Sequence, residues 1–250
     1  MARLIKLGFP LVCMAWSIIA CSKYLAPVKQ QYIQYQVGDS VSADSAYIRY
    51  YLPYKQQLEA EMDRVIGHLD VNLTKGDNAP ETLLGNFFAD ALLAEGRKSY
   101  PDAEFSFGTK GGLRIELQRG DITIGHLFEL MPFENELVLL ELSGQNVQQL
   151  AQFIASTGGQ PISGIRMKIK DNQPVDVQIA GKPIDTSRTY KLLTYDYLAN
   201  GGDNSRGLEN PVNRINLGKK VRETLIDYVS QQTREGKHIN TQLDGRITRN

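Results

Sequence analysis

Three short segments combine glycine, aromatic, amide and charged residues at positions where loops are expected. They are residues 111–114 (Gly-Gly-Leu-Arg), 132–135 (Pro-Phe-Glu-Asn) and 196–203 (Asp-Tyr-Leu-Ala-Asn-Gly-Gly-Asp). Aromatic rings stack on planar ligands, an amide can pair with the edge of a base, and a carboxylate accepts hydrogen bonds from sugar hydroxyls. Together the segments predict a site for a planar ligand that bears a sugar.

The residue types in these segments define the candidate binding residues. Gly111 and Gly112 permit a tight turn and a close approach of the backbone to a ligand. Arg114 offers a planar fork of donors that suits phosphate or hydroxyl oxygens. The other candidates are an aromatic pair, an amide and a carboxylate: Phe133, Tyr197, Asn135 and Asp203.

Each segment alone also has an ordinary structural interpretation. Phe133 fits a core residue at a turn, Tyr197 fits an aromatic at a helix start, and Arg114 fits an exposed surface arginine. The combination of the three segments, rather than any one of them, favours a binding site.

Motifs for hydrolytic chemistry do not accompany the candidate site. His68, His126 and His238 form no His-x-x-x-His or Asp-x-His spacing, and the pair His68-Leu-Asp70 is typical of a solvated surface. Residues 202–204 (Gly-Asp-Asn) are similar to part of a binuclear phosphatase motif, but no Asn-His-Glu follows. The sequence also lacks a Gly-x-Ser-x-Gly elbow and a complete phosphate-binding loop. We therefore expect no catalytic residue, metal ligand or cofactor in this chain.

The N-terminus has the pattern of a bacterial lipoprotein. Arg3 and Lys6 precede an apolar stretch, residues 7–20, that is too short to span a bilayer and suits a signal peptide. Ala20 then precedes Cys21, which is predicted to be lipidated after residues 1–20 are removed. The predicted location is the bacterial cell envelope, lipid-anchored on the periplasmic face or the outer surface.

Composition excludes one large class of function. The chain has 28 basic and 28 acidic residues, and the predicted signal peptide contains two of the basic ones. The mature chain would have 26 basic against 28 acidic residues, a formal charge of −2. Such a balance argues against a nucleic-acid partner, which requires an excess of lysine and arginine.

Periodicity predicts a mixture of helices and strands. Residues 21–43 are polar and are expected to form a tether, and residues 44–66 are expected to form a helix that contains Pro53. Three further helices are expected at residues 82–98, 144–156 and 219–233. Strands are expected at residues 105–107, 136–142, 164–170, 175–180 and 188–195. Because helices and strands do not alternate strictly, the expected fold class is α+β with a mixed β-sheet.

From about residue 60 to residue 247, the chain resembles the C-terminal domain of the 5'-nucleotidase and UDP-sugar hydrolase family. The run Leu-Ala-Asn-Gly-Gly-Asp is the most specific element of the resemblance. The other matching segments, besides the first two loops, are residues 65–67, 81–86, 120–123, 163–164 and 244–247. The resemblance implies that residues 44–66 form a connecting helix and that residues 67–250 form the domain.

The resemblance also implies roles for individual residues. Members of the family clamp a nucleobase between two aromatic rings, which correspond to Phe133 and Tyr197. The matching amide, Asn135, is expected to contact the base. Asp203 is expected to bind ribose hydroxyls, and Arg114 ribose or phosphate.

The sequence departs from the family pattern in ways that bear on function. Thr109 stands where an asparagine is usual, and residues 76–80 lack the arginines that many members have there. Tyr197 replaces a phenylalanine and adds a hydroxyl group. The resemblance does not extend to a metallophosphatase domain with its metal-binding motifs.

The function expected from the resemblance is the nucleotide- or nucleoside-binding half of a split 5'-nucleotidase. A separate metallophosphatase chain with divalent metals would hydrolyse the substrate in nucleotide catabolism. One alternative is a stand-alone lipoprotein that binds a nucleoside or nucleotide-sugar without catalysis. A degenerate domain that serves only as a structural partner is another.

Overall fold

The computed structural model of the chain describes residues 32–36, 38, 41–76 and 78–249. The chain divides into two units, Met1–Arg49 and Tyr50–Asn250. Described residues before Ser45 form neither helix nor strand, and the predicted signal peptide and Cys21 lie outside the described residues. None of the described helices is long and apolar enough to cross a membrane.

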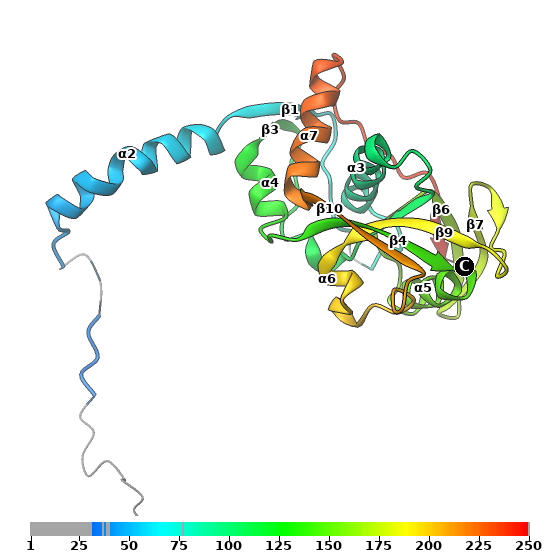
Figure 1. Cartoon of the computed structure of the whole chain (residues 1–250). Coiled ribbons are helices and arrows are strands. Elements are labelled where there is room, and N and C mark those ends of the chain that lie inside the picture. Colours follow the sequence, from blue (N-terminus) through cyan, green and yellow to red (C-terminus); the bar gives the residue numbers. More distant parts are fainter. Residues whose placement is uncertain (1–31, 37, 39–40, 77, 250) are drawn as a thin grey trace, which may run out of the picture. The chain divides into compact units, whose positions relative to one another are not determined.

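Most of the elements belong to the second unit (Figure 1). The helices are α2 (Ser45–Met62), α3 (Leu83–Ser99), α4 (Ile124–Leu130), α5 (Gly144–Ser156), α6 (Asp196–Ala199) and α7 (Val221–Arg234), with 3-10 turns η1 (Lys110–Gly112) and η2 (Gly202–Asn204). The strands are β1 (Val65–Leu69), β2 (Phe105–Phe107), β3 (Gly120–Thr123), β4 (Glu136–Ser143), β5 (Ile162–Ser163), β6 (Ile165–Lys170), β7 (Gln173–Ile179), β8 (Lys182–Pro183), β9 (Thr189–Tyr195), β10 (Asn213–Lys220) and β11 (Ile247–Arg249).

A five-stranded mixed sheet forms the centre of the domain, with the strand order β10-β4-β9-β2-β5. The pair β2 and β9 is parallel, and the other neighbours are antiparallel. This arrangement, with helices packed on the sheet, confirms the predicted α+β class.

The inner strands of the central sheet, β4, β9 and β2, are largely buried because their side chains alternate between two helices. On β2, Phe107 meets Phe153 of α5 edge to face, while the Ser106 hydroxyl on the other face donates to the Ala89 carbonyl of α3. On β9, Tyr195 meets Phe88 of α3. Apolar strand residues thus contribute to the core on both sides.

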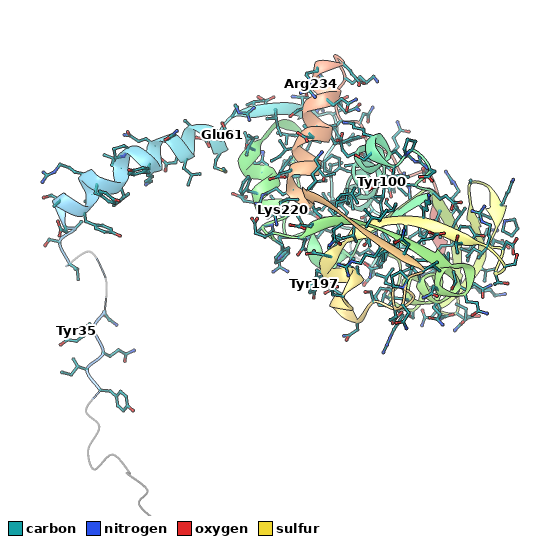
Figure 2. The ribbon with its side chains drawn as sticks, in the orientation of Figure 1. Tyr35, Glu61, Tyr100, Tyr197, Lys220 and Arg234 are labelled. Carbon is teal, nitrogen blue, oxygen red and sulfur yellow. The ribbon has the colours of Figure 1, made fainter. Side chains whose placement is uncertain are left out.

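Two smaller sheets complete the domain. The sheet β11-β6-β7-β8 packs against α5. Its strand β6 alternates strictly between buried and exposed residues, as a strand with one buried face should. The antiparallel pair β1-β3 packs against α7, where a Cβ added to Gly67 would lie 2.5 Å from the Val229 side chain. Helix α7 runs from the residue after Lys220 to Arg234 (Figure 2).

Several predicted helices and strands are present, with shifted ends. Helix α5 has the predicted limits, and α3 begins one residue later than expected because the Thr82 side chain caps it by accepting from the Gly85 amide. The helix predicted at 44–66 ends at Met62, and residues 65 and 66 belong to β1. The apolar residues Met62, Val65, Ile66 and Leu69 fit helical spacing as well as a short strand. Residues 219–220, predicted as helix, belong to β10.

The buried side chain of Arg246 attaches the C-terminal segment to the rest of the domain through hydrogen bonds. The Arg246 guanidinium donates to Asp90 Oδ1 at 2.7 Å and to the Ile162 carbonyl at 2.9 Å. It also donates to both oxygens of Asp244. These carboxylates raise the pKa of Arg246 although burial opposes them.

Candidate functional site

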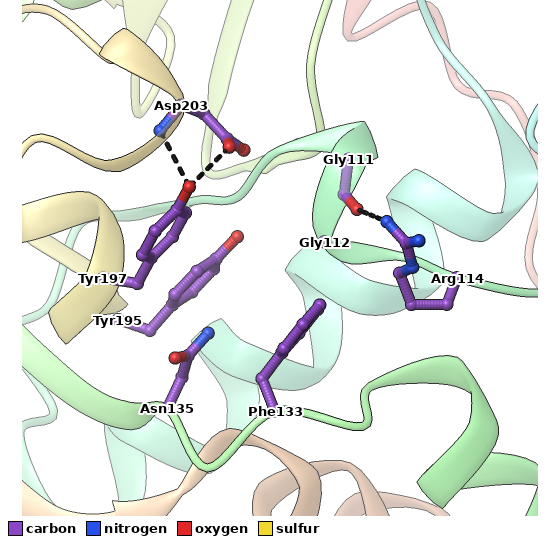
Figure 3. A pocket seen from close by; sticks show the side chains of 8 residues that line it. All are labelled: Gly111, Gly112, Arg114, Phe133, Asn135, Tyr195, Tyr197 and Asp203. Atoms are coloured by element: carbon purple, nitrogen blue, oxygen red, sulfur yellow. Dashed lines mark hydrogen bonds between the residues drawn. The ribbon is translucent and has the colours of Figure 1, made fainter. Parts of the chain in front are cut away.

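All seven predicted binding residues line one pocket. Its cavity volume is about 330 Å³, which is within the range of small-molecule sites. Figure 3 shows Phe133 and Tyr197 on two sides of this pocket, with Arg114 beyond Phe133 and Asp203 next to Tyr197. The lining residues are Gly111, Gly112, Arg114, Phe133, Asn135, Tyr195, Tyr197 and Asp203.

The central sheet brings these residues together because three of its strand ends meet at one edge. Strands β2 and β9 are parallel and end side by side, so η1 after β2 lies near α6 after β9. Strand β4 is antiparallel to β9 and begins at the same edge, where Leu137 pairs with Tyr195. The 132–135 loop, which precedes β4, and α6, which follows β9, therefore lie next to each other at this edge.

The two aromatic candidates are exposed in the pocket. Phe133 is 40% exposed and Tyr197 is 47% exposed. Phe133 is thus not the core residue that its position at a turn also allowed. Tyr197 does lie in the first turn of α6, yet its ring lines the pocket. Exposed rings in a pocket can stack on a planar ligand.

The carboxylate of Asp203 is held by two hydroxyl groups. Thr109 Oγ1 donates to Asp203 Oδ2 at 2.5 Å, and the Tyr197 hydroxyl donates to Asp203 Oδ1 at 2.9 Å. Asp203 has a left-handed backbone with φ 54°, which aspartate adopts more readily than most residues other than glycine, and its amide donates to the Tyr197 oxygen at 3.3 Å. Thr109 and Tyr197 therefore set the orientation of this carboxylate.

Tyr195 lines the pocket but was not predicted from the sequence. Its side chain is buried, and its hydroxyl lies 3.2 Å from Thr109 Oγ1. Burial raises the pKa of Tyr195 to about 12, so the hydroxyl stays protonated at neutral pH. Its position at the end of an apolar strand is typical of a core residue, and only its place two residues before Tyr197 could have indicated the pocket.

The remaining candidates supply a cation and an amide. The Arg114 guanidinium is exposed and donates to the Gly111 carbonyl at 3.3 Å. Among the described lining residues it is the only cation. The Asn135 side chain points into the pocket (Figure 3), while the Asn135 carbonyl accepts from the Val221 amide. The neighbouring Lys110 ammonium group is directed to the Ala79 carbonyl, and burial lowers its pKa.

The fold and the site define an α+β domain with an open pocket that combines two exposed aromatic rings with one carboxylate and one guanidinium group. The sequence profile of the 5'-nucleotidase C-terminal domain matches residues 65–210. The chain therefore belongs to the family of 5'-nucleotidase C-terminal domains.

Individual relatives agree with this assignment. The chain is 26% identical to the silent protein UshA(0) of Salmonella typhimurium over 190 residues, which cover 72% of this chain and 34% of that protein. It is 26% identical to a 5'-nucleotidase of Vibrio cholerae over 197 residues, covering 76% and 35% of the two chains. The chain thus spans about a third of the length of these relatives.

A solved structure has the same fold. The 5'-nucleotidase precursor of Thermus thermophilus superimposes with a TM-score of 0.70 at 26% identity. The match covers 80% of this chain and 42% of the Thermus chain.

Proposed function

We propose that this pocket binds a nucleoside or nucleotide, with the base between Phe133 and Tyr197. The observation that supports this most is that all seven residues predicted from separate loops line the same pocket. In this proposal Asn135 contacts the base edge and Asp203 accepts hydrogen bonds from the ribose hydroxyls. Arg114 lies beyond Phe133 (Figure 3), and in this proposal its guanidinium binds the phosphate group of a nucleotide.

In the proposed function, the pocket supplies its ligand to a metallophosphatase chain, and the two chains together act as a 5'-nucleotidase in nucleotide catabolism. The lining residues include one carboxylate and no histidine, a set that does not suit a binuclear hydrolytic centre. The divalent metals for hydrolysis would then come from the partner. Lipidation at Cys21 would hold this chain in the cell envelope.

A reconstitution assay tests the proposed division of labour. The full chain is mixed with a metallophosphatase chain from the same genome and a divalent metal, and phosphate release from AMP is measured. We expect hydrolysis that requires both chains and that falls when Phe133 is replaced by alanine. Ligand binding without hydrolysis in any such mixture would instead favour the stand-alone binding protein. Neither binding nor hydrolysis would favour a structural role.

Replacing Phe133 with alanine should weaken nucleoside binding by about 1–3 kcal/mol, because one stacking face is lost. Isothermal titration calorimetry with adenosine measures the change. Tyr54→Ala is a suitable control because Tyr54 is also an exposed aromatic residue, at 65%, and does not line the pocket. Equal affinities for Phe133→Ala and the original chain would show that Phe133 does not contact the base.

Replacing Tyr197 with phenylalanine should strengthen nucleoside binding by about 0.5–1.5 kcal/mol, the value of one hydrogen bond. In the free domain the Tyr197 hydroxyl donates to Asp203 Oδ1 and competes with a ribose hydroxyl for that oxygen. The substitution frees that oxygen and keeps the stacking ring. Titration with adenosine and with 2',3'-dideoxyadenosine measures the effect, and only adenosine should gain affinity. Weaker adenosine binding by the variant would contradict this role for the hydroxyl.

A further inference from the structure

Two histidines and two aspartates that are distant in sequence lie on one face of three adjacent backbone segments. Strand β1 pairs with β3 so that His68 is opposite Asp121. On its other side, β1 forms a parallel bridge between Leu69 and Ile239. This bridge places His238 beside His68, and Asp70 follows the end of β1, two residues after His68 and on the same face. We call these four residues the His–Asp cluster.

The backbone holds the cluster in register. The Ile239 amide donates to the His68 carbonyl at 2.8 Å, and the Asp70 amide donates to the Ile239 carbonyl at 3.0 Å. The two imidazole rings are 4.8 Å apart between centroids and tilted by 45°. Pairing with β1 thus fixes the segment that follows α7, and with it the position of His238.

The hydrogen bonds of the cluster also settle which ring nitrogens are available. His68 Nδ1 lies 2.9 Å from Asp121 Oδ1, and His238 Nδ1 lies 2.9 Å from Asp70 Oδ1. An ionised carboxylate only accepts hydrogen bonds, so each Nδ1 bears the hydrogen. His68 then has its lone pair on Nε2. At His238 the metal ion would replace the hydrogen between Nδ1 and Asp70 Oδ1, so that both atoms become ligands. A carboxylate on Nδ1 is the usual partner of a metal-binding histidine and strengthens the other nitrogen as a ligand.

We propose that the His–Asp cluster binds a divalent transition-metal ion of the zinc class through His68 Nε2, His238 Nδ1 and the Asp70 carboxylate. Asp121 is a positioning residue that orients the His68 ring. One ligand atom from each of the three binding residues lies within 4.8 Å of the others. Tetrahedral zinc with bonds of about 2.0–2.2 Å needs ligand atoms about 3.4 Å apart, so the widest separation must shorten by up to about 1.4 Å.

The side chains are free to make this adjustment. Those of His68, Asp70 and His238 are 39%, 41% and 58% exposed, so solvent can reach the cluster and water can complete the coordination. Two imidazoles and one carboxylate favour zinc, nickel or copper over magnesium or calcium. No residue of the cluster lines the nucleoside pocket, and β1 and β3 lie on the side of the domain away from α6 (Figure 1). The bound ion would tie the segment after α7 to β1.

Zinc titration of the full chain in detergent tests the proposal, with an affinity tag that lacks histidine. We expect a histidine-dependent site for one zinc ion per chain, and a rise of about 5–10 °C in the unfolding temperature at 100-fold excess over the dissociation constant. His68→Gln and His238→Gln should each weaken zinc binding at least tenfold. Asp121→Asn should weaken it about tenfold by loosening the ring of His68.

His126→Gln is the matched control, because glutamine keeps the capping interaction that His126 makes with Thr123 at the start of α4. This variant should bind zinc as the original chain does. Circular dichroism without metal establishes that each variant is folded, and a variant that does not fold is replaced by Asp70→Asn, for which the same loss is expected. The proposal is wrong if folded His68→Gln and His238→Gln chains keep the original affinity, or if the original chain binds no more zinc than both variants.

Discussion

Replacing Asp203 with alanine is expected to weaken adenosine binding by about 3 kcal/mol, or roughly 100-fold. In the proposed complex the carboxylate accepts two hydrogen bonds from the vicinal ribose hydroxyls, and hydrogen bonds to a charged group contribute about 1.5–3 kcal/mol each. The expected loss is smaller than the full sum because Thr109 and Tyr197 already occupy both oxygens in the free domain. Titration calorimetry measures the difference.

The sugar of the ligand provides the sharpest control for this prediction. 2',3'-Dideoxyadenosine lacks both hydroxyls, so its affinity should be low for the original chain and little changed by Asp203→Ala. Asp63→Ala removes the same charge from an exposed position outside the pocket and should leave adenosine binding unchanged. If Asp203→Ala weakened both ligands equally, the residue would support the pocket without contacting the ribose.

Replacing Arg246 with alanine should lower the free energy of unfolding by about 3 kcal/mol. The substitution removes a buried cation that donates hydrogen bonds to Asp90, Asp244 and a backbone carbonyl. The side chains of Asp90 and Asp244 are 36% and 41% exposed, so water compensates part of the loss. Urea unfolding followed by circular dichroism measures the change.

Arg166→Ala is the matched control, since Arg166 pairs with the same Asp244 at 3.4 Å but its side chain is 55% exposed. An exposed pair contributes at most about 1 kcal/mol.

Burial tends to raise the pKa of Asp244, but Arg246 and Arg166 lower it overall. The stabilisation from this pair is therefore present above the ordinary pKa of an aspartate and is lost as the pH falls through the lowered value. The difference in the free energy of unfolding between the original chain and Arg246→Ala should therefore become smaller in acid. A loss below 1 kcal/mol at neutral pH would contradict the role of Arg246.

The sequence predicted the pocket residues better than the elements around them. The residues of the pocket lie in short loops whose composition is unusual, and these loops follow or precede apolar strands that periodicity reveals. Helix α4, with seven residues, is too short for a helical period to stand out. Strand β10 has no fully buried residue, so it lacks the apolar pattern of a strand.

Two further features depend on tertiary contacts that spacing does not reveal. Tyr195 belongs to an apolar strand, and only the turn of the chain into α6 brings its ring to the pocket. His238 follows α7 and meets His68 through backbone pairing across most of the domain. Sequence spacing therefore indicated only the local pair His68 and Asp70, because it does not show that His238 lies beside them.

The meeting of three strand ends at the pocket links ligand binding to the folding equilibrium. Strands β2, β4 and β9 are neighbours only when the central sheet is formed, so an unfolded chain retains no part of the site. A ligand of this pocket must then stabilise the sheet as a whole, by an amount that grows with the logarithm of its concentration. The melting temperature of the domain should consequently rise with the affinity of a ligand at a fixed concentration. Nucleosides, nucleotides and nucleotide-sugars can therefore be ranked by the rise that each produces, without any assay of catalysis.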